Sequence, residues 1–129
     1  MALPVPIDPE GLLRSPAFAH GMLAPPGPTL YVGGQNGVDV RGELLQGLRA
    51  QTEQALRNVL AVLDAAGTDA DHVVRMTIYL APDVDPDEAY AASAEVWGVR
   101  RTAVSVLSLA PARPGALVEI DAIAIVPTD

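Results

Sequence analysis

The stretch AQTEQALRNVLAVLDAAGTDADHVVRMTIYL, residues 50–80, decides the fold because it contains two successive hydrophobic periodicities. From Leu48 to Ala66, apolar residues recur every three or four positions, which predicts a long amphipathic helix with Gly67 as the glycine that ends it. Residues 72–81, HVVRMTIYLA, are rich in β-branched side chains and alternate in polarity, which predicts a strand. A helix followed by a strand is therefore the central unit of the predicted fold.

A second helix and two strands are predicted on the C-terminal side of this unit. In DPDEAYAASAEVWG, Asp85 can cap a helix, Pro86 suits its first position, and Glu88 lies where a capping box has its acid. This helix is expected to stop near Gly98. Strands over residues 101–108 and 117–126 complete the chain, joined by the turn-rich loop APARPGA.

The N-terminal side reads as an extended lead-in followed by strands. Residues 1–28 hold seven of the twelve prolines, which predicts an extended segment with turns. TLYVGG, residues 29–34, predicts a strand. The next segment, QNGVDVRGELLQG, contains Gly37 and Gly42, which predicts a short strand or hairpin. The predicted order is β-β-α-β-α-β-β, in one α+β domain of residues 29–129 on which the lead-in packs. A chain of 129 residues fits one compact domain.

Composition argues against several classes of protein. The net charge of −8 opposes binding to nucleic acid and to anionic membrane surfaces. All eight basic residues are arginine, so Schiff-base, pyridoxal-phosphate and P-loop chemistry lack their lysine. The chain has no cysteine and only two distant histidines, so we expect no metal site and no cofactor. With no charged leader and no apolar run of bilayer length, a cytoplasmic protein is expected.

The alternation of the last two strands predicts a partner subunit. Their even-numbered positions are apolar and are expected to face the helices. Their odd-numbered positions still include Leu107 and three further apolar residues, Leu117, Ile123 and Ile125. Two helices cover only one face of a sheet, so we expect another subunit to cover the other face. Arg101 and Glu119 share the odd parity, which predicts that both lie at a cleft between subunits.

Four stretches taken together resemble the Rid family of reactive intermediate deaminases, also called the YjgF family. They are YVGGQNGVDVRGEL, the helix–strand unit quoted first, RTAVSVLSLA and LVEIDAIAI, and the resemblance covers roughly residues 29–126 in the same order of elements. It implies a chorismate-mutase-like α+β fold with two helices on one face of a mixed sheet. It also implies a homotrimer whose sheets meet in a central barrel, with ligand clefts between subunits.

The resemblance implies a reaction and the residues that perform it. Family members hydrolyse imines and enamines such as 2-iminopropanoate and 2-iminobutanoate, releasing ammonia and a 2-keto acid. Arg101 stands where the family has its carboxylate-binding arginine, and a guanidinium forks onto a carboxylate without losing its proton near pH 7. Glu119 stands where the family has the glutamate that handles water. Gly34 and the main chain at Ala103 are expected to approach the ligand closely.

The chain departs from the pattern of the active deaminases at four points. They resemble one another in a proline two residues before the arginine and a cysteine two residues after it, where this chain has Val99 and Ala103. Their N-terminal aromatic hydroxyl is matched here by Phe18, which we expect to contact the substrate, and the asparagine of their second helix has no counterpart. Lost hydrogen bonds shift preference among substrates, so the actual substrate stays open.

These residues also have structural interpretations. Arg101 can form an intersubunit salt bridge, for example to Asp121 or Glu119, since ion-pair networks also place charges in clefts. Glu119 is then a buried partner with no water to activate. Gly34 and the glycine before it can admit a β-bulge. A lone histidine such as His20 is typical of a surface or packing residue.

Three functions follow from these alternatives. The first is a homotrimeric imine and enamine deaminase that acts on a small carboxylate-bearing metabolite. The second is a non-catalytic protein of the same family that binds such a metabolite without turnover. The third is an endoribonuclease, an activity claimed for some family members, which the net charge of −8 on each chain opposes.

Overall fold

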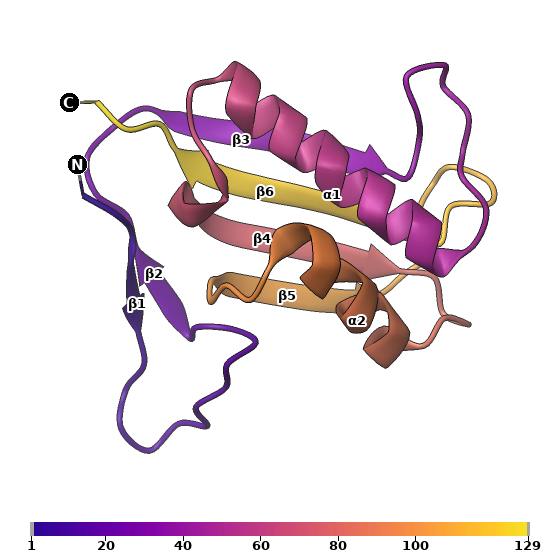
Figure 1. The fold of residues 1–129 in the computed structure, drawn as a ribbon. Helices are drawn as coiled ribbons and strands as arrows, with labels where there is room; N and C mark the ends of the chain where they lie inside the picture. Colours follow the sequence, from indigo (N-terminus) through magenta and orange to yellow (C-terminus); the bar gives the residue numbers. More distant parts are fainter. Residues whose placement is uncertain (1, 129) are drawn as a thin grey trace.

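The computed structural model describes residues 2–128 and is built around one four-stranded sheet (Figure 1). Its strands lie in the order β3 (Thr29–Asn36), β6 (Val118–Ile125), β4 (Val73–Leu80) and β5 (Ala103–Ser108). The pairs β3–β6 and β6–β4 are antiparallel, and β4–β5 is parallel, so the sheet is mixed. Two helices, α1 (Leu48–Ala65) and α2 (Pro86–Trp97), lie on one face of the sheet. The predicted α+β fold is confirmed in this respect.

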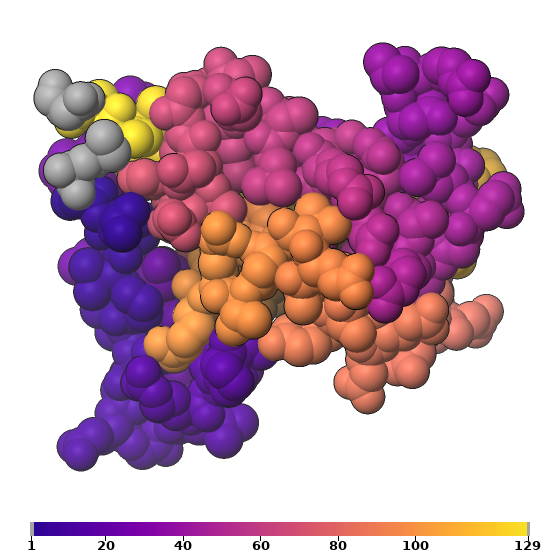
Figure 2. Space-filling view, in the orientation of Figure 1, coloured from indigo at the N-terminus to yellow at the C-terminus, as the bar shows by residue number. Residues whose placement is uncertain are grey.

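The core lies between α1 and the helix-facing side of the sheet. The largest fully buried side chains come from α1, β4 and β6: Leu56, Val59, Leu63, Val73, Val118 and Ile120. Burying one such aliphatic side chain contributes about 1.5–3 kcal/mol. The even positions of β6 are buried as predicted, whereas Val106 on the edge strand β5 stays more than half exposed because only β4 flanks it. Figure 2 shows α1 and α2 in front of the sheet on this face.

Helix α1 ends as its sequence predicts. Gly67 has φ of +81°, a conformation that glycine adopts without steric cost. Its N–H donates to the carbonyl of Asp64, and the N–H of Thr68 donates to the carbonyl of Leu63. These two bonds form the Schellman arrangement, which satisfies the last carbonyls of the helix. A short 3₁₀ turn, η1 (Ala70–His72), then leads directly into β4.

Helix α2 begins at the predicted cap, although the capping box does not form as predicted. The side chain of Asp85 accepts a hydrogen bond from the N–H of Asp87, and Pro86 occupies the first helical position. The N–H bound by Asp85 is therefore that of the second helical residue, Asp87, and not that of the third, Glu88. The exposed carboxylate of Glu88 lies in the first turn. A carboxylate near a helix N-terminus is stabilised by the helix dipole even without a direct bond.

Of the short strand or hairpin predicted after β3, a tight hairpin is formed and a regular strand is not. Between Gly37 and Gly47 the chain makes one isolated bridge, from Val38 to Leu44. The carboxylate of Asp39 accepts hydrogen bonds from the N–H groups of Arg41 and Glu43, and this local turn competes with strand pairing. Extended structure instead appears in the proline-rich segment, where β1 (Val5–Ile7) pairs with β2 (Gly21–Leu23). The order is therefore β-β-β-α-β-α-β-β.

The apolar outer face is smaller than predicted. Leu107 is 45% exposed and Ile123 is partly buried, as expected for that face. Leu117 instead lies just before β6 and packs against the core, and Ile125 is only 5% exposed. Ile125 is covered because the chain at Gly27 passes so close that a Cβ there would be 3.0 Å from its Cγ2. Tyr31, which is 74% exposed, adds an aromatic ring to the outer surface.

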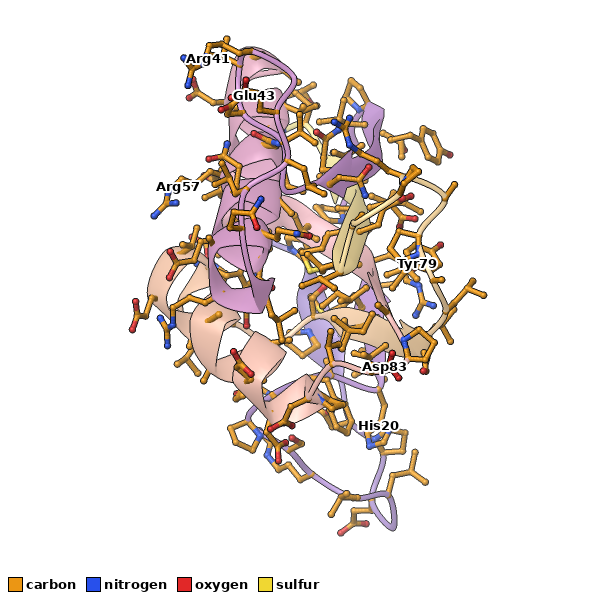
Figure 3. The ribbon with its side chains drawn as sticks, turned by 90° about the vertical axis from the view of Figure 1, so that its right-hand side faces the viewer. His20, Arg41, Glu43, Arg57, Tyr79 and Asp83 are labelled. Carbon is orange, nitrogen blue, oxygen red and sulfur yellow. The ribbon has the colours of Figure 1, made fainter. Side chains whose placement is uncertain are left out.

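Figure 3 views the molecule from the side, with the helices on one side of the sheet and Tyr79 on the other. Arg57 projects from the outer side of α1, whereas His20 lies on the N-terminal loop below the sheet. Within residues 2–128, no helix is long and apolar enough to cross a membrane.

Candidate functional site

Arg101 lies two residues before Ala103, the first residue of β5, and its side chain turns toward the N-terminal segment. The Nε–H donates to the main-chain carbonyls of Ser15 at 2.9 Å and of Phe18 at 3.2 Å. The terminal Nη2 lies 2.7 Å from Oδ1 of Asp8. The Arg101 side chain is 20% exposed and the Asp8 side chain 10% exposed, so the ion pair is largely shielded from water. Within the chain, Asp8 is the acidic partner of Arg101, and the salt bridge predicted across the subunit interface to Asp121 or Glu119 stays a prediction.

Asp8 is held as a carboxylate by its neighbours. The guanidinium of Arg101 is the main cause of the lowered pKa of Asp8, and the N–H of His20 lowers that pKa further. Arg14 lies 3.7 Å from its other oxygen and acts in the same direction. Since Arg101 keeps its proton near neutral pH, the pair is fully charged there.

Phe18 contributes its main chain to Arg101 and its ring to a different environment. The ring packs edge-to-face on His20, with the ring centroids 5.3 Å apart. It also borders a cavity of about 190 Å³ beneath α2. That cavity is lined chiefly by apolar side chains and includes Val99, the residue that replaces the expected proline. His20 is an exposed residue whose ring packs on that of Phe18, as expected of a lone histidine.

Glu119 lies in a second group of residues, on the outer face of β6. Its Oε1 accepts a hydrogen bond from the side-chain amide of Asn36 at 3.3 Å. A Cβ on Gly34 would lie 2.2 Å from Oε2, so the carboxylate occupies the space that this glycine leaves. The pairing of β3 with β6 shifts register between Val32 and Gln35, so the predicted bulge at the glycine pair is confirmed. Glu119 also borders a hollow of about 260 Å³ with Tyr79 and the loop 109–112.

Tyr79 and Asp121 form a hydrogen bond beside this hollow. The Tyr79 hydroxyl donates to Oδ2 of Asp121 at 3.1 Å, and this bond raises the pKa of the tyrosine. Desolvation and the nearby negative charges, that of Glu119 included, raise the pKa further. Tyr79 therefore stays protonated at neutral pH and keeps Asp121 as an acceptor.

The predicted residues fall into two half-sites at opposite ends of the sheet. The arginine half-site contains Arg101, Asp8 and the main chain of Phe18, with Ala103 two residues further along the chain at the start of β5. The glutamate half-site contains Glu119, Gly34, Asn36 and Tyr79. Glu119 pairs with Tyr79, which pairs with Leu107, six residues beyond Arg101. At about 3.3 Å per residue, the two half-sites are about 20 Å apart along the strands. One chain does not bring Arg101 and Glu119 together.

Three contributors were not anticipated from the sequence: Asp8, Asn36 and Tyr79. Asn36 had a signal in the sequence, because it stands two residues after Gly34, just beyond the glycine bulge. Asp8 had none, because its contact with Arg101 depends on how the N-terminal segment folds back. Within residues 2–128, no group of three metal-ligating side chains comes together.

The sequence matches one protein family along most of its length. A model of the family described as endoribonuclease L-PSP covers residues 15–126. The match includes Phe18, Gly34, Arg101 and Glu119, whereas Asp8 lies before it.

Individual relatives agree with this match. A RutC family protein of Pyrococcus horikoshii is 33% identical over 97 residues, which are 74% of this chain and 77% of that protein. A human protein named 2-iminobutanoate/2-iminopropanoate deaminase is 32% identical over 99 residues, covering 75% of this chain and 72% of its own. A crystal structure of a Rid-family protein of unknown function from Yersinia pestis is 33% identical and superposes with a TM-score of 0.85. That superposition covers 96% of this chain and 99% of the other.

Proposed function

Because the chain belongs to the Rid family, described as endoribonuclease L-PSP, we propose that it is a hydrolytic deaminase of small carboxylate-bearing imines and enamines. Substrates of the 2-iminopropanoate and 2-iminobutanoate type are converted to ammonia and the 2-keto acid. The observation that carries the proposal is the shielded guanidinium of Arg101, of which only Nε makes directed hydrogen bonds to residues in the described chain. The name of the human relative supports the reaction type.

The proposed active site lies between subunits. Because the two half-sites lie at opposite ends of the sheet, a head-to-tail arrangement sets the arginine half-site of one chain against the glutamate half-site of the next. Such an interface closes into a ring, and a homotrimer is the ring we propose, as the family resemblance implies. The exposed Tyr31 and Leu107 on the outer face suit burial in that assembly.

Each half-site has its own task in the hydrolysis. Arg101 binds the substrate carboxylate and so fixes the orientation of the imine. Glu119 orients a water molecule toward the imine carbon, accepts its proton as the C–O bond forms, and returns a proton to the leaving nitrogen. As the C–N bond breaks, the proton of the newly formed hydroxyl passes through Glu119 to the nitrogen, leaving ammonia and the 2-keto acid. The backbone at Gly34 and Ala103 contacts the ligand, and Phe18 lines the apolar side of the cleft.

Ribonuclease activity is a weaker candidate for this chain. RNA binding relies on neutralising phosphates with cationic side chains. The chain carries a net charge of −8, and one of the most shielded arginines, Arg101, is already paired with Asp8. Salt-dependent RNA binding by the purified protein would reverse this ranking.

The experiment that tests the proposed function generates 2-imino acids in place with an amino-acid oxidase and traps them with semicarbazide. We expect the wild-type protein to suppress trapping of 2-iminopropanoate or 2-iminobutanoate. Arg101→Ala and Glu119→Gln are each expected to lower this activity by about 10²-fold or more, as loss of a positioned catalytic group does. Arg57→Ala is the control, since Arg57 projects from the outer side of α1 (Figure 3).

The outcomes separate the candidate functions. Suppression by the wild type that is lost in both site variants supports the deaminase. Binding of 2-oxobutanoate by the wild type without any effect on trapping supports a non-catalytic metabolite-binding protein instead. Suppression that persists in Arg101→Ala contradicts the assignment of the site.

A further inference from the structure

Asp8 and the N-terminal main chain occupy one complete edge of the Arg101 guanidinium. This edge consists of Nε–H and Nη2, and it is one of the two edges with which arginine forks onto a carboxylate. The carbonyls of Ser15 and Phe18 take the Nε–H, and Asp8 Oδ1 lies 2.7 Å from Nη2. Nη2 is buried, so no outside oxygen reaches it in this conformation. Both two-pronged modes of carboxylate binding use Nη2, and both are blocked.

We propose that Asp8 is an internal competitor for the ligand carboxylate, so that a small carboxylate binds Arg101 in a two-pronged mode only when Asp8 leaves Nη2. This inference rests on the proposed role of Arg101 as the carboxylate-binding residue. Asp8 thereby sets the affinity of the site: the stronger its pairing with Arg101, the smaller the fraction of protein that is ready to bind, and the observed affinity falls by that fraction.

The geometry of the pair favours exchange. Although Nη2 and Oδ1 are in close contact, Nη2 lacks a well-aligned hydrogen bond to any residue of the described chain. An ion pair without this alignment forgoes part of the strength of a charge-assisted hydrogen bond. A ligand carboxylate that aligns with the N–H groups of Arg101 forms the full charge-assisted hydrogen bonds that Asp8 does not form.

Asp8 has a second cation to which it can turn. Its Oδ2 lies 3.7 Å from Nη1 of Arg14, whose side chain is 74% exposed. A carboxylate displaced from Arg101 therefore keeps a positively charged neighbour and is not left unpaired. The segment that carries Asp8 is anchored by two three-residue strands, β1 with all side chains exposed and β2 with its residues partly buried or exposed. Short two-stranded ribbons of this kind are only marginally stable. Such an element can shift at small cost.

Carboxylate binding to the intact protein tests the proposal without relying on turnover. The probes are 2-oxobutanoate and acetate, titrated at pH 7 by calorimetry and by NMR. Asp8→Asn keeps the size of the side chain and removes its charge. Glu10→Gln is the matched control, because Glu10 is exposed on the same segment and its substitution changes the net charge by the same amount. Arg101→Ala reports whether the probe uses the proposed site.

We expect Asp8→Asn to bind both probes about tenfold more tightly than the wild type, as for a site that is open in about a tenth of the molecules. Glu10→Gln is expected to match the wild type, and Arg101→Ala is expected to lose binding. In the wild type, the ¹³C signal of the Asp8 carboxylate and the amide signals of β1 and β2 should move with probe saturation. This movement distinguishes displacement of Asp8 from a mere change of charge.

Two results overturn the inference and leave the proposed function intact. The first is unchanged or weaker binding by Asp8→Asn while Arg101→Ala abolishes binding. The second is a stationary Asp8 signal while the probe saturates the wild type. Wild-type affinity in Arg101→Ala has a different meaning: it contradicts the role of Arg101 itself, and the proposed function falls with the inference.

Discussion

Glu119 occupies space that exists only because residue 34 has no side chain. A Cβ on Gly34 would meet the end of the Glu119 side chain at 2.2 Å, whereas a Cβ on Gly33 would meet nothing within 4 Å. We therefore expect Gly34→Ala to push the carboxylate aside and lower kcat/KM by about 10²-fold, the effect of misplacing a catalytic group by about 1 Å. The trapping assay measures this loss.

Gly33→Ala is the matched control for that change. The two substitutions add the same methyl group to neighbouring residues of the bulge, and we expect Gly33→Ala to retain activity. Both variants should unfold at a temperature close to that of the wild type, because the atoms displaced by Gly34→Ala belong to the movable end of a side chain. Equal activity of the two variants would show that the position of Glu119 is not critical.

The hydrogen bond from Tyr79 to Asp121 predicts a distinct alkaline titration. Because the bond and the nearby carboxylates raise the pKa of Tyr79, its stabilising effect is complete below pH 10 and is lost as the pH rises through the folded value. Absorbance at 295 nm, followed from pH 8 to 12 in the wild type and in Tyr79→Phe, isolates this group from the other two tyrosines. A Tyr79 titration at or below the ordinary value of about 10 would contradict the contact.

The loop after β3 passes close to the main chain of helix α1 at Gly37. A Cβ on Gly37 would lie 2.4 Å from the Cα of Gln51 in α1, a contact with main chain that cannot move alone. We expect Gly37→Ala to lower the free energy of unfolding by about 3 kcal/mol, toward the upper end of the usual range for overpacking. Urea unfolding measures the change, with Gly33→Ala as a control that should lose much less.

The N-terminal hairpin should weaken in acid. Asp8 has a lowered pKa in the folded state, so its contribution is present above the ordinary carboxyl value of about 3.9 and is lost as the pH falls through the lower folded value. Asp8→Asn has no such charge to lose. Proteolysis within residues 9–20 should therefore accelerate as the pH is lowered from about 5 to about 3, the range around the ordinary carboxyl pKa. The acceleration should be larger in the wild type than in Asp8→Asn. An equal acceleration in both would exclude Asp8 as the cause.

The helices and the sheet strands could be predicted because each carries its own periodicity. Helix α1, bounded by Leu48 and Ala65, agrees with the sequence to within one residue. After β3, where a short strand or hairpin was predicted, only a tight hairpin forms. The turn at Asp39 is made by side-chain hydrogen bonds, which hydrophobic alternation does not report. The burial of Ile125 likewise depends on a distant segment that passes at Gly27.

The candidate site was predictable only in part. Parity correctly put Glu119 on the outer face of the sheet, and the glycine pair correctly indicated the bulge beside it. The partner of Arg101 was out of reach, because Asp8 is 93 positions away and no local pattern links two such residues. Long-range ion pairs are decided by the path of the chain, which the N-terminal prolines restrict but do not specify.

As an assembly, the molecule should show complementation between defective chains. Arg101→Ala and Glu119→Gln chains, co-expressed with different tags and purified through both, should form mixed trimers in which about one cleft in three combines an intact Arg101 with an intact Glu119. Activity near that fraction of the wild-type value is expected in the trapping assay, although each variant alone is inactive. Light scattering should give three times the 13.4 kDa mass of one chain. Mixed trimers without recovered activity would indicate that each chain uses its own two residues.

The separation of the two half-sites determines how an inactive variant of the chain affects wild-type chains in the same cell. In the proposed ring, a subunit whose arginine half-site and glutamate half-site lie at opposite ends of its sheet would contribute to the clefts with both neighbours. A copy that folds normally but carries both Arg101→Ala and Glu119→Gln would silence two clefts at once and spare only the cleft it does not touch. In a cell that makes both forms, the double variant would be dominant-negative, whereas a variant that fails to fold would be recessive.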